Sequence, residues 1–145
     1  MRLVLQRVKE ARVFVRGEKV SEIGAGFLLL TGIGPNDDEN VLAKAAKKIC
    51  ALRIFEDEQD KINLDLRRVG GEILAVSQFT LYADCRKGNR PSFAGAAEPE
   101  KAKLLFDKFV LLLKEQGFKV QTGVFAEYMD VELINWGPVT LYLEF

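Results

Sequence analysis

Apolar and polar residues alternate at the start of the chain, over residues 2–8 and again over residues 12–16, which predicts two β-strands. Two later segments, Phe27–Thr31 and Ile73–Val76, are almost continuously apolar. Such runs are typical of strands that are buried on both faces of a sheet. The pattern therefore predicts a sheet with buried central strands.

Two further segments repeat apolar residues at helical spacing. The first extends to Leu52 and follows Asn36–Glu39, which supplies N-cap candidates and an acidic first turn. The second begins at Pro99, since proline suits the first position of a helix, and ends at Gly117. Its apolar face is wide enough to pack on a sheet.

The C-terminal part alternates in two arms, residues 129–134 and 139–145, separated by Gly137 and Pro138, and this pattern predicts a hairpin. The order of elements is strands, two strand–helix units, then strands. It predicts an α/β fold with mixed β-sheet layers and two helices packed on one side, in β/β/α layering. We expect one domain over residues 1–145.

Composition narrows the chemistry. With 48% hydrophobic residues the chain can bury a core without disulfides, and we expect Cys50 to be buried and Cys85 exposed, both as thiols. No apolar run approaches a membrane span and no leader pattern precedes the first strand, so we expect a cytoplasmic protein.

Histidine is absent, which excludes Ser-His-Asp and Cys-His nucleophilic systems and every histidine-ligated metal site. We expect neither a metal nor a cofactor. Basic and acidic residues balance at 21 each, so the chain has no overall field for gripping a long nucleic acid. Contact with one end of a nucleic acid remains compatible with this balance.

Two motifs suggest sites that we reject. Gly32-x-Gly34 lies between a predicted strand and a helix, but the third glycine of a dinucleotide loop is missing and Pro35 sits in the loop. The acidic run Glu56–Asp60 lacks the ligand spacing and internal glycine of a calcium loop, so we interpret it as a solvated turn.

The segment Ser77–Thr80 directly follows a buried strand, and ligands of such sheets bind at the carboxyl ends of strands. The alternative is purely structural: the Ser77 and Thr80 hydroxyls bond the backbone and Phe79 fills the core. Gly137-Pro138 has two interpretations as well. It is either a simple turn, or a turn that presents its own carbonyls to a ligand, because glycine has no side chain to obstruct it.

Ser77-Gln78-Phe79-Thr80-Leu81 and Asn135-Trp136-Gly137-Pro138-Val139-Thr140 together resemble the two signature motifs of the D-aminoacyl-tRNA deacylases. The resemblance covers nearly the whole chain. It includes Gln6-Arg7-Val8, Leu52–Phe55, Asp84–Gly88 and Arg90–Phe93.

The resemblance implies a homodimeric hydrolase. Its substrate is the ester that joins a D-amino acid, or glycine mischarged on tRNA-Ala, to the 3′-terminal adenosine of the tRNA. It further implies that the Gly137-Pro138 peptide is cis, that this turn enters the site of the partner subunit, and that its two carbonyls bind the substrate's α-amino group.

The resemblance also assigns residues. Ser77, Gln78, Phe79 and Thr80 are expected at the catalytic centre, and Gly137, Pro138, Asn135, Thr140, Met129 and Arg7 in substrate binding. Arg7 is expected to brace the turn. Trp136 stands where relatives often carry a small or acidic residue, and we expect its ring to pack outward rather than contact substrate.

The sequence places no evident base beside Thr80, so a threonine nucleophile is not favoured. We expect backbone N–H groups of Phe79 and Thr80 to polarise the ester carbonyl, while the ribose 2′-hydroxyl or a water that it orients assists attack. Two other functions stay open: a non-catalytic module that binds tRNA ends or nucleotides, and an interaction domain whose Gly-Pro turn serves only dimerisation.

Overall fold

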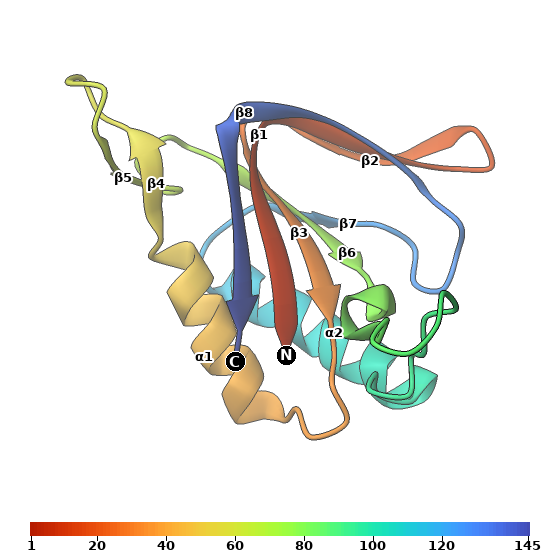
Figure 1. Cartoon of the computed structure of the whole chain (residues 1–145). Coiled ribbons are helices and arrows are strands. Elements are labelled where there is room, and N and C mark those ends of the chain that lie inside the picture. Colours follow the sequence, from red (N-terminus) through yellow and green to blue (C-terminus); the bar gives the residue numbers. More distant parts are fainter.

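A six-stranded mixed sheet forms the body of the computed structural model, which describes residues 1–145 (Figure 1). The strands follow the order β2 (Glu18–Ile23), β1 (Arg2–Val15), β3 (Gly26–Gly32), β6 (Glu72–Ser77) and β7 (Val120–Thr122), and β8 (Asp130–Glu144) also pairs with β1. The helices α1 (Glu39–Cys50) and α2 (Pro99–Glu115) cover one side. This arrangement confirms the predicted fold class.

The two predicted N-terminal strands are one strand, β1, which pairs with β3 over its first half and with β2 over its second. The predicted C-terminal hairpin is wrong. Both of its arms belong to β8, and both run antiparallel to β1. β1 and β8 bend together in Figure 1. The sheet is therefore folded into two layers, and both strands run from one layer into the other. Gly137-Pro138 therefore interrupts a strand and does not reverse the chain.

Apolar side chains fill both faces of this sheet. The larger core lies between the sheet and the helices and contains Leu3, Leu5, Phe27 and Phe109, all fully buried. A smaller core, with Val8 and Leu28 among its members, lies on the other face. Strands buried on both faces need apolar residues at every position, which explains the continuous runs in β3 and β6.

The helices begin where the sequence predicts and end two residues before the predicted ends, at Cys50 and Glu115. Asp38 caps α1 by accepting a hydrogen bond from the Val41 N–H (3.0 Å), and this bond lowers the pKa of the Asp38 carboxyl. Pro99 opens α2, and Gly117 follows its end with φ +87°. Cys50 is buried and Cys85 exposed, as expected. No helix combines the length and the apolar character that crossing a membrane requires.

The acidic run is the turn of a short hairpin, β4 (Arg53–Glu56) and β5 (Ile62–Asp65), which the sequence did not predict. The Asp57 carboxylate closes the turn by accepting from the Gln59 and Lys61 N–H groups and from the Asn63 side chain. These bonds lower the pKa of Asp57. The solvated turn is thus confirmed, but its flanks form strands.

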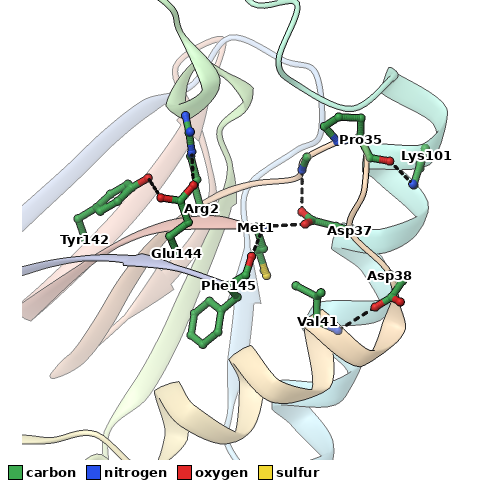
Figure 2. Close-up of polar contacts among 11 residues, drawn as sticks. Met1, Arg2, Pro35, Asp37, Asp38, Val41, Lys101, Tyr142, Glu144 and Phe145 are labelled. Carbon is green, nitrogen blue, oxygen red and sulfur yellow. Dashed lines mark hydrogen bonds and ion pairs between the residues drawn. The ribbon is translucent and has the colours of Figure 1, made fainter.

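Both ends of the chain meet beside the loop that follows β3 (Figure 2). The Met1 ammonium group lies 2.6 Å from Asp37 Oδ1, in a buried ion pair, and also donates to the Phe145 carbonyl. The second carboxylate oxygen of Asp37 accepts from the Gly34 N–H at 2.7 Å. Since Asp37 is itself buried, this pair fixes the Gly32–Asp38 loop against the end of β1.

Candidate active site

The segment Ser77–Thr80 lies at the carboxyl end of β6, where the sequence placed it. Ser77 pairs with Thr31 of the parallel strand β3, and the Gln78 N–H donates to the Thr31 carbonyl at 2.8 Å. The chain then leaves the sheet as a 3-10 helix, η1 (Phe79–Tyr82). Its first internal bond runs from the Leu81 N–H to the Gln78 carbonyl, so the N–H groups of Phe79 and Thr80 precede the helical bonding.

The side chains of this segment do not follow the purely structural interpretation. Phe79 is 54% exposed instead of filling the core, and its ring meets the edge of Phe93 with centroids 5.0 Å apart. The Thr80 hydroxyl accepts a hydrogen bond from the Gln78 side chain, not from the backbone. Ser77 and Gln78 are half-buried. The segment therefore presents an exposed aromatic ring and two linked polar groups.

Two glycines hold η1 close to the sheet. A Cβ at Gly32 would lie 3.1 Å from the Gln78 carbonyl oxygen, and one at Gly34 would lie 2.5 Å from the Tyr82 hydroxyl oxygen. The Gly32-x-Gly34 motif thus makes room for Tyr82 and does not cradle a phosphate. Burial, helped by the nearby charge of Asp37, raises the pKa of Tyr82 to about 12.

Arg2 secures η1 from the other side. Its guanidinium donates to the Leu81 carbonyl (3.1 Å), stacks over the Tyr82 ring at 4.5 Å, and pairs with Glu144 at 3.0 Å (Figure 2 draws the Glu144 contact). The hydrogen bond from Arg2 lowers the pKa of Glu144. η1 is thus tied to both terminal strands.

The Gly-Pro turn, which we define as Asn135–Thr140, bulges out of the β1–β8 ladder. Between the pairs Gln6–Thr140 and Val8–Asn135, β1 advances by two residues and β8 by five. The Gly137-Pro138 peptide is cis, and Gly137 has φ +130°, in the region that favours glycine. Gly137 and Pro138 are both exposed. The bulge therefore offers main chain to whatever lies in front of it.

Arg7 lies behind this turn and is only 1% exposed, which a solvated strand residue would not be. Its Nε donates to the Trp136 carbonyl at 2.7 Å, its Nη1 to the Ile54 carbonyl at 2.7 Å, and its Nη2 to Glu56 Oε1 at 3.2 Å. A Cβ at Gly137 would lie 2.8 Å from Nη2. Arg7 thus touches the turn both by a hydrogen bond and by close packing, as a brace does.

Trp136 packs inward, so the expectation that its ring points outward is wrong. The ring meets Phe55 edge-on at 5.7 Å and lies 5.4 Å from the Arg7 guanidinium. Phe55 is fully buried and stacks on Phe27 at 5.3 Å. The aromatic edge and the cation over its face both favour this packing. Trp136 therefore belongs to the support of the turn.

Of the remaining predicted residues, Thr140 and Asn135 lie at the Gly-Pro turn and Met129 does not. Thr140 pairs with Gln6 at one end of the bulge, and Asn135 lies at the other end, where its Oδ1 accepts from the Gln6 side chain at 3.4 Å. Met129 lies elsewhere. Its sulfur accepts from the Val124 N–H, and it packs on Gly123 beside Val76, the residue before Ser77.

Within one chain the Gly-Pro turn and Ser77–Thr80 are far apart. Neighbouring strands pair Ser77 with Thr31, Thr31 with Leu3, and Leu3 with Leu143. Gly137, by contrast, lies beside Arg7, further along β1. At about 4.8 Å between strands and 3.3 Å per residue, the offset is roughly 14 Å across the sheet and roughly 13 Å along it. Figure 1 shows the same separation between the bend of β8 and the green turn after β6.

The segment Ser77–Thr80 contains no histidine, lysine or carboxylate that could act as a general base, and the carboxylate behind the turn, Glu56, is paired with Arg7. No group of three or more histidine, cysteine or acidic residues is placed to hold a metal. In the neighbouring loop, Arg86 pairs with Asp84 at 2.7 Å and holds the pKa of that carboxyl well below its usual range. Two open hollows lie on the β4–β5 hairpin, lined around Asn63 and Leu64, and no residue of the two predicted motifs lines either of them.

The support roles of Ile54, Phe55 and Glu56 were not predicted from the sequence, although the family resemblance included Leu52–Phe55. These residues lie in a stretch dominated by charge, and a four-residue strand gives too short a pattern to recognise. The signal that was present is Ile54-Phe55, an apolar pair between the charged residues Arg53 and Glu56.

Comparison with known proteins gives a consistent result. Residues 4–144 match the sequence model of a family described as D-Tyr-tRNA(Tyr) deacylase. The D-aminoacyl-tRNA deacylase of Desulfatibacillum aliphaticivorans is 56% identical over 144 residues, which cover 99% of each chain. That of Thermotoga petrophila is 51% identical, over 99% of this chain and 97% of its own.

Two solved structures share the fold. One, described as c-Myc DNA Unwinding Element Binding Protein, superimposes with a TM-score of 0.93 at 40% identity and covers 99% of this chain and 98% of its own. The other, described as a probable eukaryotic D-amino acid tRNA deacylase, gives a TM-score of 0.83 at 18% identity over 98% and 97%. At 18% identity the second likeness concerns the fold alone.

Proposed function

This chain belongs to the D-Tyr-tRNA(Tyr) deacylase family, and from that premise we propose that two copies of it build each catalytic site together. Membership confirms the resemblance drawn from the two motifs. The reaction is the hydrolysis of D-aminoacyl-tRNA to a free D-amino acid and tRNA. Since that substrate belongs to translation, we place the reaction in the cytoplasm.

The separation of the two motifs carries the proposal of a shared site. A single aminoacyl group is smaller than the offset between Ser77 and Gly137, so one chain cannot enclose it with both segments. A symmetric dimer brings the same two surfaces together in pairs, turn to strand end and strand end to turn. In this homodimer the turn of each subunit completes its partner's site.

The turn selects the chirality of the substrate. The carbonyls of the exposed residues Gly137 and Pro138 bind the α-amino group, and the absence of a reaching side chain lets the backbone approach closely. With the ammonium fixed, an L-residue would direct its side chain into the wall, whereas a D-residue directs hydrogen there. Glycine presents hydrogen on both sides, so the same filter admits glycyl-tRNA mischarged on tRNA-Ala.

Ser77–Thr80 supplies the chemistry. The N–H groups of Phe79 and Thr80 bind the carbonyl oxygen as it gains charge, and Ser77 and Gln78 position the terminal adenosine. Water, oriented by the ribose 2′-hydroxyl, adds to the carbonyl carbon. The ester C–O bond then breaks and the ribose 3′-oxygen takes the proton. Thr80 is not the nucleophile in this scheme, because no base lies beside it.

An assay with D-Tyr-tRNA and L-Tyr-tRNA tests the reaction. We expect loss of the D-ester only. Protection of either ester without turnover would indicate a non-catalytic module that binds tRNA ends, and no effect on either would leave an interaction domain.

Subunit mixing tests the shared site. A Gly137→Leu variant and a Gln78→Ala variant are each expected to be inactive, because each lacks one half of every site. Random pairing of the two should restore about a quarter of the wild-type activity, since half of the dimers are mixed and each has one intact site of two. No recovery in proven mixed dimers would contradict a site shared between subunits.

A further inference from the structure

Strand β4 lies directly behind the Gly-Pro turn and contacts its support with three consecutive residues. The Ile54 carbonyl accepts from Arg7 Nη1 at 2.7 Å, the Phe55 ring meets Trp136 edge-on, and Glu56 Oε1 pairs with Arg7 Nη2 at 3.2 Å. β4 belongs to a separate two-stranded sheet and is not part of the main one. A small hairpin therefore backs the part of the chain that reads the substrate.

The Arg7 side chain donates hydrogen bonds only to the turn and to β4. Of its three bonds to other residues, one goes to the turn, at the Trp136 carbonyl, and two go to β4. The guanidinium is almost completely buried, so water cannot take the place of a lost partner. Glu56 is the only carboxylate within 4.0 Å of Arg7. The charge of Arg7 is thus balanced by this one group.

We propose that Glu56 is a positioning residue for the Gly-Pro turn, which it holds through Arg7 so that the main-chain carbonyls keep the spacing that distinguishes D- from L-substrates. This inference rests on the proposed role of the turn in chiral selection. Glu56 does not touch substrate in this scheme. It fixes the tilt of the planar guanidinium, and the Nε–H of that plane fixes the Trp136 carbonyl one residue before Gly137.

The carboxylate is suited to this task and accessible to substitution. The Glu56 side chain is 41% exposed, so Glu56→Gln keeps its shape and an acceptor oxygen while it removes the charge, without opening a cavity. Glu58 is the matched control. It lies in the same hairpin, is exposed, and makes no ion pair with Arg7, so Glu58→Gln changes the net charge equally.

The experiment compares the steady-state deacylation of D-Tyr-tRNA and L-Tyr-tRNA by the wild type, Glu56→Gln and Glu58→Gln. We expect Glu56→Gln to lower kcat on the D-ester about tenfold with a smaller change in KM, because a misplaced turn binds the substrate but orients it poorly. The ratio of D- to L-activity should fall as well. Glu58→Gln should match the wild type in both.

A cycle with Arg7→Lys separates positioning from a merely structural role. If Glu56 acts through Arg7, Glu56→Gln should change kcat and the D/L ratio by less than about twofold in an Arg7→Lys background, since the effects of coupled residues do not add. Effects that multiply fully would overturn the proposal. So would wild-type kcat and D/L ratio in Glu56→Gln.

A second variant and the stereoselectivity of the wild type keep the result interpretable. If Glu56→Gln yields too little folded protein, Glu56→Asp replaces it: the shortened side chain should also lower the D/L ratio, and a wild-type ratio would count against the proposal. Wild-type enzyme that deacylates only the D-ester while Glu56→Gln does the same at equal rate refutes this inference alone. Wild-type enzyme without stereoselectivity refutes the proposed function.

Discussion

The Gly-Pro turn and the segment Ser77–Thr80 are held in place by different means. Behind the turn lies a buried guanidinium with three acceptors, flanked by Trp136 and Phe55. Beneath η1, by contrast, two glycines leave room in which the Tyr82 ring packs. The first region is fixed mainly by directed polar bonds, whereas the second is fixed by the fit of Tyr82 against the glycines together with the contacts of Arg2.

The difference matches the roles that we propose for the two regions. A main-chain filter must hold its carbonyls to a fraction of an ångström, and a guanidinium that donates to three separate acceptors gives that directional control. The strand end must leave Phe79 and Thr80 exposed to a large substrate, so its support lies underneath and away from the solvent. Loss of a polar group behind the turn should therefore damage the turn, and added volume should damage the strand end as well as the crowded Gly137.

Gly137→Ala should have the largest effect. The new Cβ would lie 2.8 Å from Arg7 Nη2, and Arg7 cannot retreat without losing its bonds; φ +130° adds backbone strain. We expect the kcat/KM of D-Tyr-tRNA deacylation to fall by about 100-fold or more. Gly17→Ala is the control, because Gly17 also has positive φ but nothing within 4 Å. Equal activity of Gly137→Ala and wild type would show that the turn is not in the site.

Gly34→Ala should have a smaller effect, through volume. Its Cβ would lie 2.5 Å from the Tyr82 hydroxyl oxygen and would displace η1 from below. We expect a loss of roughly 1–2 kcal/mol in the free energy of unfolding and about a tenfold lower kcat/KM. Urea unfolding and the deacylation assay measure both, with Gly24→Ala as the control at an uncrowded glycine. A stable, fully active Gly34→Ala would mean that η1 is not held by packing.

Sequence patterns predicted the elements that depend on uniform burial or on contacts between residues close in sequence. The runs in β3 and β6 are apolar at every position because both faces are buried, and the caps at Asp38 and Pro99 act within a few residues. The strand end at Ser77 followed from those runs. These features are local, so they could be predicted without knowing which strands pair.

The turn could not be predicted in the same way, because its geometry depends on strand pairing. Both arms of β8 pair with β1, which made the expected hairpin wrong, and no local pattern reveals a bulge opposite Arg7. Arg7 itself has apolar and polar neighbours like any exposed strand residue. Its burial results from Glu56 and Ile54, about fifty residues away in sequence, and only the family resemblance indicated its role.

Thr80→Ala tests the chemistry at the strand end and should have a modest effect. The variant loses a hydroxyl that accepts from the Gln78 side chain, but it keeps the main-chain N–H that we propose binds the oxyanion. We expect kcat to fall by no more than about threefold, the scale of one lost neutral hydrogen bond. Complete loss of activity in a folded protein that still binds substrate would make Thr80 the nucleophile. Single-turnover kinetics would then be needed to detect an acyl-enzyme.

The smallest expected effect concerns pH and the packing beneath η1. Burial raises the pKa of Tyr82 to about 12, whereas an unfolded tyrosine has a pKa of about 10. The folded state therefore disfavours the ionised ring, and its stability is complete below pH 10 and declines as the pH rises towards 12. Because the ring is partly solvated, we expect a decline of roughly 1 kcal/mol in the free energy of unfolding, less than the full shift would give.

Urea unfolding of the wild type and of Tyr82→Phe between pH 9 and 12 measures the contribution of Tyr82 to this decline. The difference between the two proteins isolates that contribution, since the variant lacks this titration while every other group remains. Tyr128→Phe, at a solvated ring, should leave the decline unchanged. A decline in Tyr82→Phe as large as that of the wild type would show that Tyr82 is not packed against the Gly32–Gly34 loop in solution, and the shape-based half of the comparison would fail with it.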